Sequence, residues 1–273
     1  MVVGWKVVGE VEEFKMKFTK LNEDKKIGKL ALLIEGTDET FANTIRRMII
    51  EEVPVLAVED LEIRDNNSAL YDEMLALRLG LTPIKTDLSS YNLPEECKCA
   101  GAGCAQCQLK IELKSNKPGL VYAKDAKSSD PKCTFVYPKM PFVKLIKEQK
   151  IDMTMTAIMG KGKEHTKWTP ALVYYKNEPK LTIGNVKNPE EIVKKSTDGV
   201  LVMKGNKLAV NEDNLYTSNL VEFYSELDNN IKLEYTGNII FFIESWGQLT
   251  CKEILNKSVD LLLEKVNIME GLI

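Results

Sequence analysis

Apolar residues near the start of the chain recur first with the period of a helix and then with that of a strand. Asp38 and Glu39 suit a helix start, because acidic side chains complement the positive end of the helix dipole. Pro54 disfavours helical backbone at the preceding residue, so the pattern predicts a helix over Asp38–Glu52. Its apolar face, at spacing i, i+4, i+7 and i+8, carries Phe41, Ile45, Met48 and Ile49.

Alternation of apolar and polar residues predicts the first strands. Upstream of the helix, Phe14, Met16 and Phe18 alternate with polar residues, which is typical of a half-buried strand. A second strand over Leu30–Glu35 ends at Gly36, and the two are expected to form a hairpin. Directly after the helix, one side of another strand is expected to carry Val55, Ala57, Leu61 and Ile63, with Glu59 as the exception.

A second helix is predicted over about Leu70–Leu79, with Gly80 as a left-handed cap at its end. A stripe of apolar residues at helical spacing is usually part of a core. The residues of this stripe are Leu70, Met74, Leu77 and Leu81. Further short strands are predicted over Leu109–Leu113, Val121–Ala123, Ile151–Ile158, Ile231–Tyr235 and Ile239–Glu244.

Residues 185–228 form a small insert in this prediction, and a long helix follows it. The insert is expected to contain, in order, a helix starting at Pro189, strands over Val200–Met203 and Lys207–Val210, and a helix over Thr217–Glu226. Thr250 and Glu253 form a capping box that starts the last helix, over Thr250–Val266. The apolar face of this helix carries Leu255, Val259, Leu262 and Val266.

Composition narrows the class of protein. The 273 residues are 44% hydrophobic and 28% charged, enough apolar material for one large or two modest domains. The net charge of −3 lacks the basic excess of a protein that holds nucleic acid by itself. Without a run of about 18 apolar residues or a signal-peptide pattern at the N-terminus, a cytosolic protein is expected. Its six cysteines should then be reduced or metal-bound.

Four of the cysteines lie within eleven residues, spaced by alanine and glycine that allow tight backbone turns. This spacing predicts a structural Zn²⁺ bound by four thiolates. An iron–sulfur cluster also uses four thiolates and is the alternative metal centre. Without a metal, the four thiols would be an oxidation liability. The candidate ligands are Cys97, Cys99, Cys104 and Cys107.

The segment Gly160–Trp168 contains two glycines, three lysines and the only histidine, His165. The glycines and lysines could suggest phosphate binding, but the segment lacks the spacing of a phosphate-binding loop. A nucleophilic site would need a positioned serine or cysteine beside His165, and no motif supplies one. Clustered aspartates of the kind that hold two Mg²⁺ ions in polymerases are also absent, so no catalytic residue is predicted.

Five blocks of this sequence, in order, resemble the RNA polymerase assembly-subunit family. That family contains the N-terminal domain of the bacterial alpha subunit, the archaeal D subunits and the eukaryotic third-largest subunits. Three of the blocks are FANTIRRMIIEEVPVLAVEDLEI, DEMLALRLGLTPI and FFIESWGQLTCKEIL. The cysteine loop and GKGKEHTKW resemble the archaeal and eukaryotic members and favour those branches over the bacterial one, and the hypothesis is an archaeal member. Leu77 departs from the family pattern, where a histidine is usual.

The resemblance implies an α+β fold. A discontinuous dimerisation domain, a sheet plus two helices, is expected over residues 1–54 and 176–273. A mostly-β domain inserted at 55–175 is expected to carry the metal loop 97–107. The 185–228 insert resembles the ferredoxin-like insert of the archaeal members but has no cysteine, so no iron–sulfur cluster is expected in it.

The resemblance also implies a non-catalytic scaffold in transcription. Subunit L is the expected heterodimer partner, and the pair is expected to nucleate assembly of the second-largest subunit and of small subunits N and P. DNA would be contacted only through the assembled enzyme. The expected dimer interface consists of the apolar faces of the helices at 38–52 and 250–266. The expected contacts with the large subunit are Arg46, Arg47, Lys163, Glu164, His165 and Trp168.

One alternative belongs to a different functional class. A free-standing metal- or redox-sensing protein could use the same cysteine cluster, Cys97–Cys107, and would act without partner subunits. A small-molecule enzyme is disfavoured, because the sequence contains no paired acid–base or phosphate-binding motif.

Overall fold

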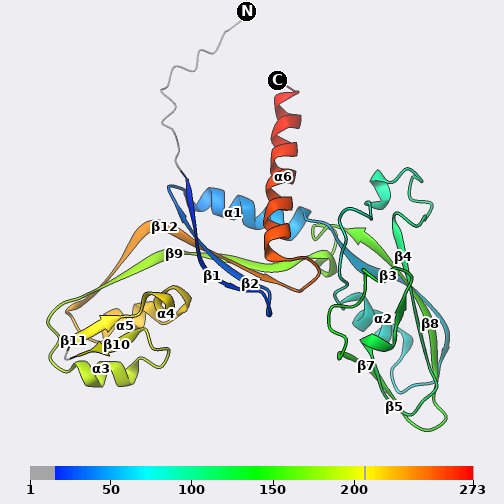
Figure 1. Cartoon of the computed structure of the whole chain (residues 1–273), viewed down its shortest axis with the longest axis horizontal. Coiled ribbons are helices and arrows are strands. Elements are labelled where there is room, and N and C mark those ends of the chain that lie inside the picture. The colour runs from blue at the N-terminus through cyan, green and yellow to red at the C-terminus, as the bar shows by residue number, and fades with distance from the viewer. Residues whose placement is uncertain (1–15, 206, 273) are drawn as a thin grey trace, which may run out of the picture. The chain divides into compact units, whose positions relative to one another are not determined.

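The structure is a computed structural model that describes residues 16–205 and 207–272 (Figure 1). Phe14, predicted to lie in the first strand, falls outside the described residues. The fold mixes helices with several antiparallel sheets, in agreement with the expected α+β class. Among the helices of the described residues, none has the length and apolar character needed to cross a bilayer.

The first sheet has four strands in the order β1-β2-β12-β9. These are β1 (Lys17–Asp24), β2 (Lys29–Glu35), β12 (Ile231–Ser245) and β9 (Ala171–Ile183). The two strands predicted over Ile231–Tyr235 and Ile239–Glu244 form the single continuous strand β12. Gly237 adopts a φ of 84°, which glycine tolerates without a steric penalty, and the strand continues through it.

The orientation predicted for β1 is wrong. Met16 and Phe18 are exposed, whereas Thr19 and Leu21 are partly buried. Leu21 packs against a small cluster that contains Ala31 from β2 and residues of β12. The apolar alternation identified the strand but assigned its inner face to the wrong set of side chains.

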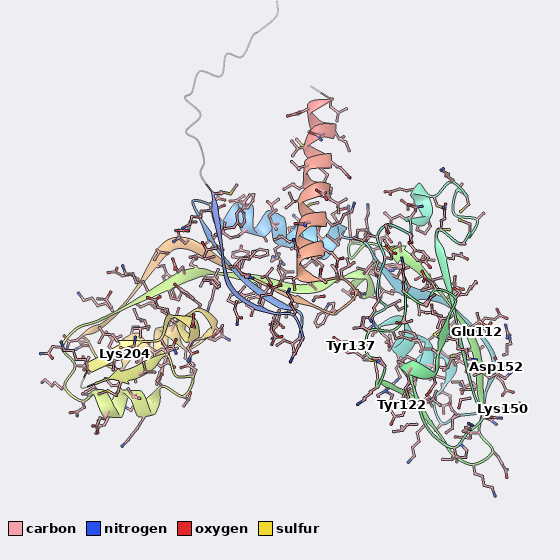
Figure 2. The ribbon with its side chains drawn as sticks, viewed as in Figure 1. Glu112, Tyr122, Tyr137, Lys150, Asp152 and Lys204 are labelled. Carbon is pink, nitrogen blue, oxygen red and sulfur yellow. The ribbon has the colours of Figure 1, made fainter. Side chains whose placement is uncertain are left out.

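The second sheet has four strands in the order β3-β8-β4-β6. These are β3 (Val55–Asn66), β8 (Ile151–Gly160), β4 (Gln108–Ser115) and β6 (Lys127–Ser128). The two-stranded ribbon of β5 (Gly119–Tyr122) and β7 (Pro141–Leu145) contributes to the same core, as do Leu109, Ile111 and Leu113. Near the start of β8, Lys150 and Asp152 form ion pairs with Asp65 and Lys114 (Figure 2).

A β-bulge at Glu59 explains why this residue broke the predicted alternation in β3. Val58 pairs with Ala157 and Asp60 pairs with Thr156, so Glu59 has no opposing residue. An extra residue reverses the phase of the side chains beyond it. The face that contacts this core therefore carries Leu56 and Val58 before the bulge and Leu61 and Ile63 after it. The prediction was right for the two residues after the bulge and wrong for the two before it.

Helix α2 (Asp72–Gly80) is present, but its predicted inner face is mostly on the outside. Leu75 and Leu79 are buried in the core. Met74, Leu77 and Leu81 are exposed, and only Leu70 packs partly against the core. Gly80 is a helical residue without positive φ, so the predicted left-handed cap is also wrong.

The 185–228 insert contains α3 (Pro189–Lys195), β10 (Leu201–Lys204), β11 (Lys207–Val210), α4 (Glu212–Thr217) and α5 (Val221–Glu226). The single helix predicted over Thr217–Glu226 is wrong. The Asn211 side chain accepts a hydrogen bond from the Asn214 amide and so starts α4 earlier, and this helix ends at Thr217. Val200, Leu201, Leu215 and Tyr224 form the centre of a separate apolar cluster.

The helix predicted over Asp38–Glu52 consists of two parts. Helix α1 (Glu39–Arg47) continues into a π-helical turn, η1 (Met48–Glu52). Helix α6 (Cys251–Glu270) starts with the predicted capping box of Thr250 and Glu253 and packs against η1. Short 3-10 turns occur at η2 (Pro94–Glu96), η3 (Ala123–Asp125) and η4 (Thr166–Trp168).

The chain divides into two compact units that only partly follow the predicted domains. Within the described residues, one contains 16–22, 31–42 and 175–242, and the other contains 23–30, 43–174 and 243–272. One boundary, after Tyr174, lies a single residue from the expected start at 176. The unit with 43–174 also holds α6, which the predicted domains group with residues 1–54. The functional assignment of the domains remains a prediction.

Candidate functional site

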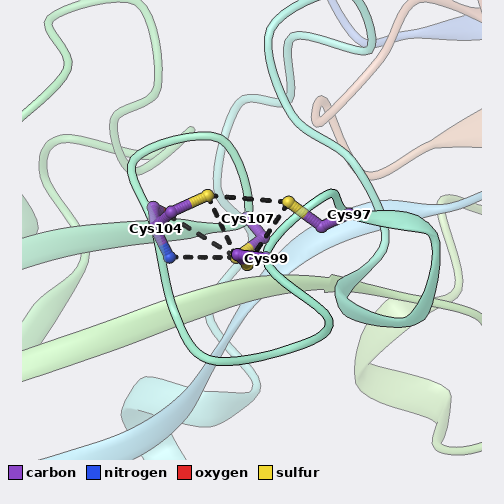
Figure 3. Close-up of side chains that lie close together, drawn as sticks. All are labelled: Cys97, Cys99, Cys104 and Cys107. Atoms are coloured by element: carbon purple, nitrogen blue, oxygen red, sulfur yellow. Dashed lines mark hydrogen bonds between the residues drawn. The ribbon is translucent and has the colours of Figure 1, made fainter.

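The four clustered cysteines converge on one point in the loop between η2 and β4 (Figure 3). All four sulfur atoms lie within 4.8 Å of one another. The Cys97 and Cys104 sulfurs are 3.5 Å apart, and those of Cys99 and Cys107 are also 3.5 Å apart. Cys97 and Cys107 are buried, and the other two are partly exposed.

Small residues let the backbone bring these thiols together. Ala100, Gly101 and Gly103 all have positive φ, a conformation that larger residues rarely adopt. Gly103 has a φ of 87°, and a Cβ atom there would also lie 2.7 Å from the side-chain amide of Gln108, which would have to move. The alanine and glycine spacing is therefore a geometric requirement of the loop.

The geometry and the thiol chemistry fit a single metal ion. Around one ion bound at about 2.3 Å, four sulfurs at tetrahedral corners lie about 3.8 Å apart, close to the distances in the loop. Hydrogen bonds with the Cys107 and Cys97 thiols lower the pKa of Cys99 to about 6. Burial raises the pKa of Cys107 to about 12. A bound cation would compensate the charge that four thiolates otherwise accumulate there.

The remaining two cysteines lie apart from this cluster. Cys133 is fully buried in the core of the second sheet, where burial raises its pKa to about 11. The Cys251 thiol lies at the start of α6 and donates a hydrogen bond to the Gly28 carbonyl oxygen at 3.1 Å. Cys251 is thus partly buried by packing.

The two helical stripes predicted to form a dimer interface differ in exposure. Ile45 and Met48 are each 6% exposed and Ile49 is 0% exposed, so these side chains belong to the chain's own core. This corrects the expectation that they face a partner, and Phe41 is the one partly exposed member of that stripe. On α6, by contrast, Val259 is 39% and Val266 is 42% exposed, with Leu255 and Leu262 partly exposed.

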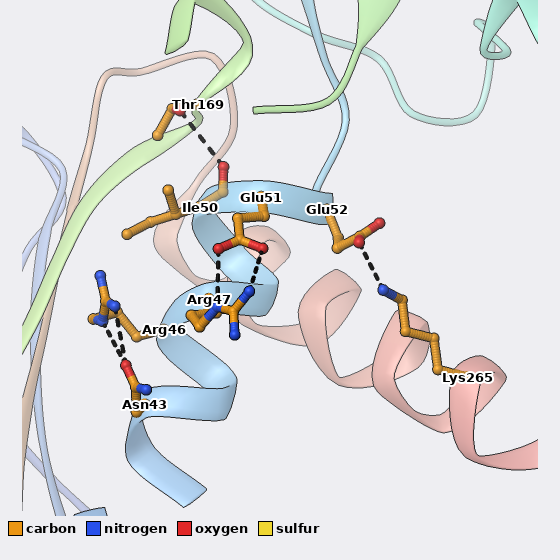
Figure 4. A network of polar contacts seen from close by, with 8 residues as sticks. All are labelled: Asn43, Arg46, Arg47, Ile50, Glu51, Glu52, Thr169 and Lys265. Carbon is orange, nitrogen blue, oxygen red and sulfur yellow. Dashed lines mark hydrogen bonds and ion pairs between the residues drawn. The ribbon is translucent and has the colours of Figure 1, made fainter. Parts of the chain in front are cut away.

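The loop from Gly160 to Thr169 packs against the π-helical turn η1. The Lys163 amide donates to the Glu51 carbonyl at 3.0 Å, and the Thr169 hydroxyl contacts the Ile50 carbonyl at 3.5 Å (Figure 4). A Cβ atom at Gly162 would lie 1.9 Å from that Ile50 oxygen, so only glycine fits. These contacts join the 160–169 loop to η1, although the two segments lie far apart in the sequence.

Trp168 does not lie at the surface as predicted. Its indole is buried and donates to the Ile158 carbonyl at 3.3 Å, while a Cβ atom at Gly160 would collide with the ring. The Lys167 ammonium lies over the ring and forms an ion pair with Glu59, the bulge residue of β3. The buried Trp168 ring therefore holds the loop in place. The sequence signal for this packing was Gly160, which leaves space for the ring.

The charged members of the predicted large-subunit contact are accessible. Lys163, Glu164 and His165 are exposed. Arg47 is exposed and forms a two-pronged ion pair with Glu51, with distances of 2.9 and 3.1 Å (Figure 4). The partly buried Arg46 donates to the Asn43 side chain on its own helix. The structure thus places both arginines and the 163–165 loop beside η1.

Glu52 is a site residue that the sequence analysis missed. Its carboxylate lies 2.6 Å from the Lys265 ammonium on α6 and 3.7 Å from the Lys161 ammonium in the loop. Burial disfavours the charged form, yet the hydrogen bond with Lys265 and the nearby ammonium groups leave the pKa of Glu52 below its usual range. No local sequence pattern relates a glutamate at 52 to lysines more than 100 positions away.

Comparison with known proteins gives the family. Residues 61–171 match the family described as RNA polymerase Rpb3/RpoA insert domain. DNA-directed RNA polymerase subunit Rpo3 of Methanosphaera stadtmanae is 39% identical over 246 residues, covering 86% of this chain and 91% of that protein. The Methanosarcina acetivorans Rpo3 is 34% identical, covering 88% and 89%. The Archaeoglobus fulgidus Rpo3 is 31% identical, covering 92% and 96%. On this similarity along most of its length, the chain belongs to the archaeal RNA polymerase subunit Rpo3 family.

Proposed function

We propose that this chain is a non-catalytic assembly subunit of an archaeal DNA-dependent RNA polymerase and forms a heterodimer with subunit L. The observation that carries the proposal is the apolar face of α6, which stays exposed in a chain whose relatives are polymerase subunits. Exposed apolar surface of this kind is typical of a permanent subunit interface. The alternative of a free-standing metal or redox sensor gains no support from the family.

The proposed dimer interface on α6 consists of Leu255, Val259, Leu262 and Val266. Phe41 on α1 is proposed as a further contact of subunit L. Figure 1 shows the last turns of α6, in red, extending beyond the turns that lie beside η1. On α6, Leu263 is 55% exposed, and Met269 near the end of the helix is 63% exposed. A partner helix laid along it would bury apolar surface that the chain alone leaves in water.

A second surface would receive the large subunit. Lys163, Glu164 and His165, with Arg46 and Arg47, form a charged area around η1 that suits a polar and specific contact. We assign this area to the second-largest subunit, whose assembly the heterodimer would nucleate together with small subunits N and P. DNA would be reached only through the assembled enzyme in the cytoplasm, and the isolated chain would carry out no catalysis.

The cysteine loop would hold one structural Zn²⁺ through Cys97, Cys99, Cys104 and Cys107. An iron–sulfur cluster places several iron ions between its thiolates and needs them farther apart than the 4.8 Å limit in this loop. The 185–228 insert would hold no cluster, since it contains no cysteine to supply the thiolates that a cluster needs. Elemental analysis should give about one zinc per chain, and visible absorption typical of iron–sulfur centres would contradict this assignment.

Co-expression with subunit L tests the central proposal. The two chains should elute as one 1:1 complex in size-exclusion chromatography, and replacing both Val259 and Val266 by serine should dissociate it. The matched control is Leu120→Ser, which changes a similarly exposed apolar residue in the β5–β7 ribbon. A wild-type chain that stays soluble and monomeric beside subunit L would contradict the proposal.

A further inference from the structure

Glu52 occupies a junction between two parts of the chain that are far apart in sequence. It ends the π-helical turn η1, and its side chain is only 13% exposed. One carboxylate oxygen faces Lys265 of α6 at 2.6 Å, and the other faces Lys161 of the 160–169 loop at 3.7 Å. Figure 4 shows the pair with Lys265, and with the Lys161 pair a single carboxylate is shared by the proposed dimer helix and the proposed large-subunit loop.

The loop is bound tightly on its side of this junction. The three consecutive residues Ile50, Glu51 and Glu52 all contact it, the first two through their backbone carbonyls and the third through its side chain. Because a Cβ atom at Gly162 would overlap the Ile50 carbonyl, Gly162 lies directly against η1, and a movement of η1 toward the loop would displace it. The exposed residues 163–165 directly follow this contact point.

The helix side of the junction is open to a partner. Lys265 is adjacent to Val266 and one turn beyond Leu262, both members of the proposed dimer interface. Its side chain is 50% exposed, so water now screens the ion pair with Glu52. A partner protein docked along the stripe would exclude part of this water, and an ion pair strengthens as the local dielectric constant falls.

We propose that Glu52 couples the two binding surfaces, so that docking of subunit L on α6 orders the 160–169 loop for the large subunit. This inference rests on the proposed function and adds the residue that links its two interfaces. By thermodynamic linkage, the large subunit then strengthens binding of subunit L by the same factor. The result is an assembly order in which the heterodimer, rather than the free chain, is the species that captures the large subunit.

Hydrogen exchange in the full chain tests the coupling, with Glu52→Gln as the variant. In the wild type, subunit L should slow exchange of the Lys163, Glu164 and Thr169 amides, which donate hydrogen bonds within the loop or to η1. In Glu52→Gln, subunit L should still bind but this slowing should disappear. The matched control is Glu51→Gln, because Glu51 pairs with Arg47 on its own helix. In this control the slowing should persist.

The equilibrium version of the test measures binding of the second-largest subunit with and without subunit L. For the wild type, subunit L should lower the dissociation constant by about fivefold or more, the low end of typical coupling. For Glu52→Gln and for Lys265→Gln the ratio should approach one. If subunit L binds and Glu52→Gln keeps the full ratio and the full loop protection, the coupling is refuted while the scaffold function stands. If subunit L fails to bind the wild type, the proposed function itself is refuted.

Discussion

Two helical stripes that look alike in the sequence have opposite surroundings in the structure. The α1–η1 stripe is almost completely covered, with Ile49 at 0% exposure, whereas Val266 on α6 remains 42% exposed. Both have apolar residues at the spacing of one helix face. Periodicity therefore identifies a face that must be covered but does not tell which chain covers it. The following predictions use this contrast, from the largest expected effect to the smallest.

Ile49→Ala should destabilise the chain itself. Removing a fully buried isoleucine side chain costs about 2–5 kcal/mol, because the lost transfer free energy is accompanied by a cavity. Urea unfolding of the full chain, followed by circular dichroism, should give a correspondingly lower midpoint. Ile268→Ala on the exposed end of α6 is the control and should leave the midpoint nearly unchanged. Equal midpoints for the two variants would mean that the contrast in burial is absent in solution.

Replacing both Val259 and Val266 by serine should produce the opposite result. The unfolding midpoint should hardly change, since these side chains are exposed in the chain alone. Association with subunit L should weaken by about 2 kcal/mol or more, about thirtyfold in the dissociation constant, because buried valines are lost from the interface. Isothermal titration calorimetry measures this directly. Unchanged affinity would remove α6 from the proposed interface.

The same limit of periodicity accounts for the errors in the predicted fold. On α2 the stripe that included Leu77 and Leu81 lies outside, and the core instead takes Leu75 and Leu79. Both sets satisfy helical spacing, so only tertiary packing distinguishes them. In β3, one extra residue at Glu59 reversed the face of everything after it. A bulge leaves no mark in the sequence beyond one misplaced polar residue.

The convergence of the four cysteines could be predicted from the sequence because they lie within eleven residues and local geometry brings their thiols together. The contacts of η1 with α6 and with the 160–169 loop could not be predicted, because they join residues that lie far apart in the sequence. The role of Gly162 depends on the Ile50 carbonyl, and that of Glu52 depends on Lys265. Trp168 was predicted to contact the large subunit because of the family resemblance of its segment, and the close approach of its ring to Gly160 is likewise a tertiary contact.

Gly162→Ala tests whether the 160–169 loop packs closely against η1. The added methyl group would overlap the Ile50 oxygen, and overpacking of this kind costs about 1–3 kcal/mol. The unfolding midpoint should fall, and exchange at the Lys163 amide should become faster. Gly80→Ala is the matched control, because a Cβ atom there meets the Val58 carbonyl at an ordinary 3.7 Å. If both variants unfold alike, the loop is less tightly seated than the structure indicates.

The smallest expected effect is a dependence of stability on pH through Glu52. Because its folded-state pKa is lowered from 4.5, the stabilisation is present at neutral pH and is lost as the pH falls through the folded-state pKa. Ion pairs with exposed members contribute only about 0.2–1 kcal/mol, so the effect is modest. Urea midpoints of the wild type and of Glu52→Gln should differ at pH 7 and converge on acidification below about pH 4.5. If the two urea midpoints still differ at low pH, the lower stability of Glu52→Gln comes from altered packing of η1 against α6 and not from loss of the carboxylate charge.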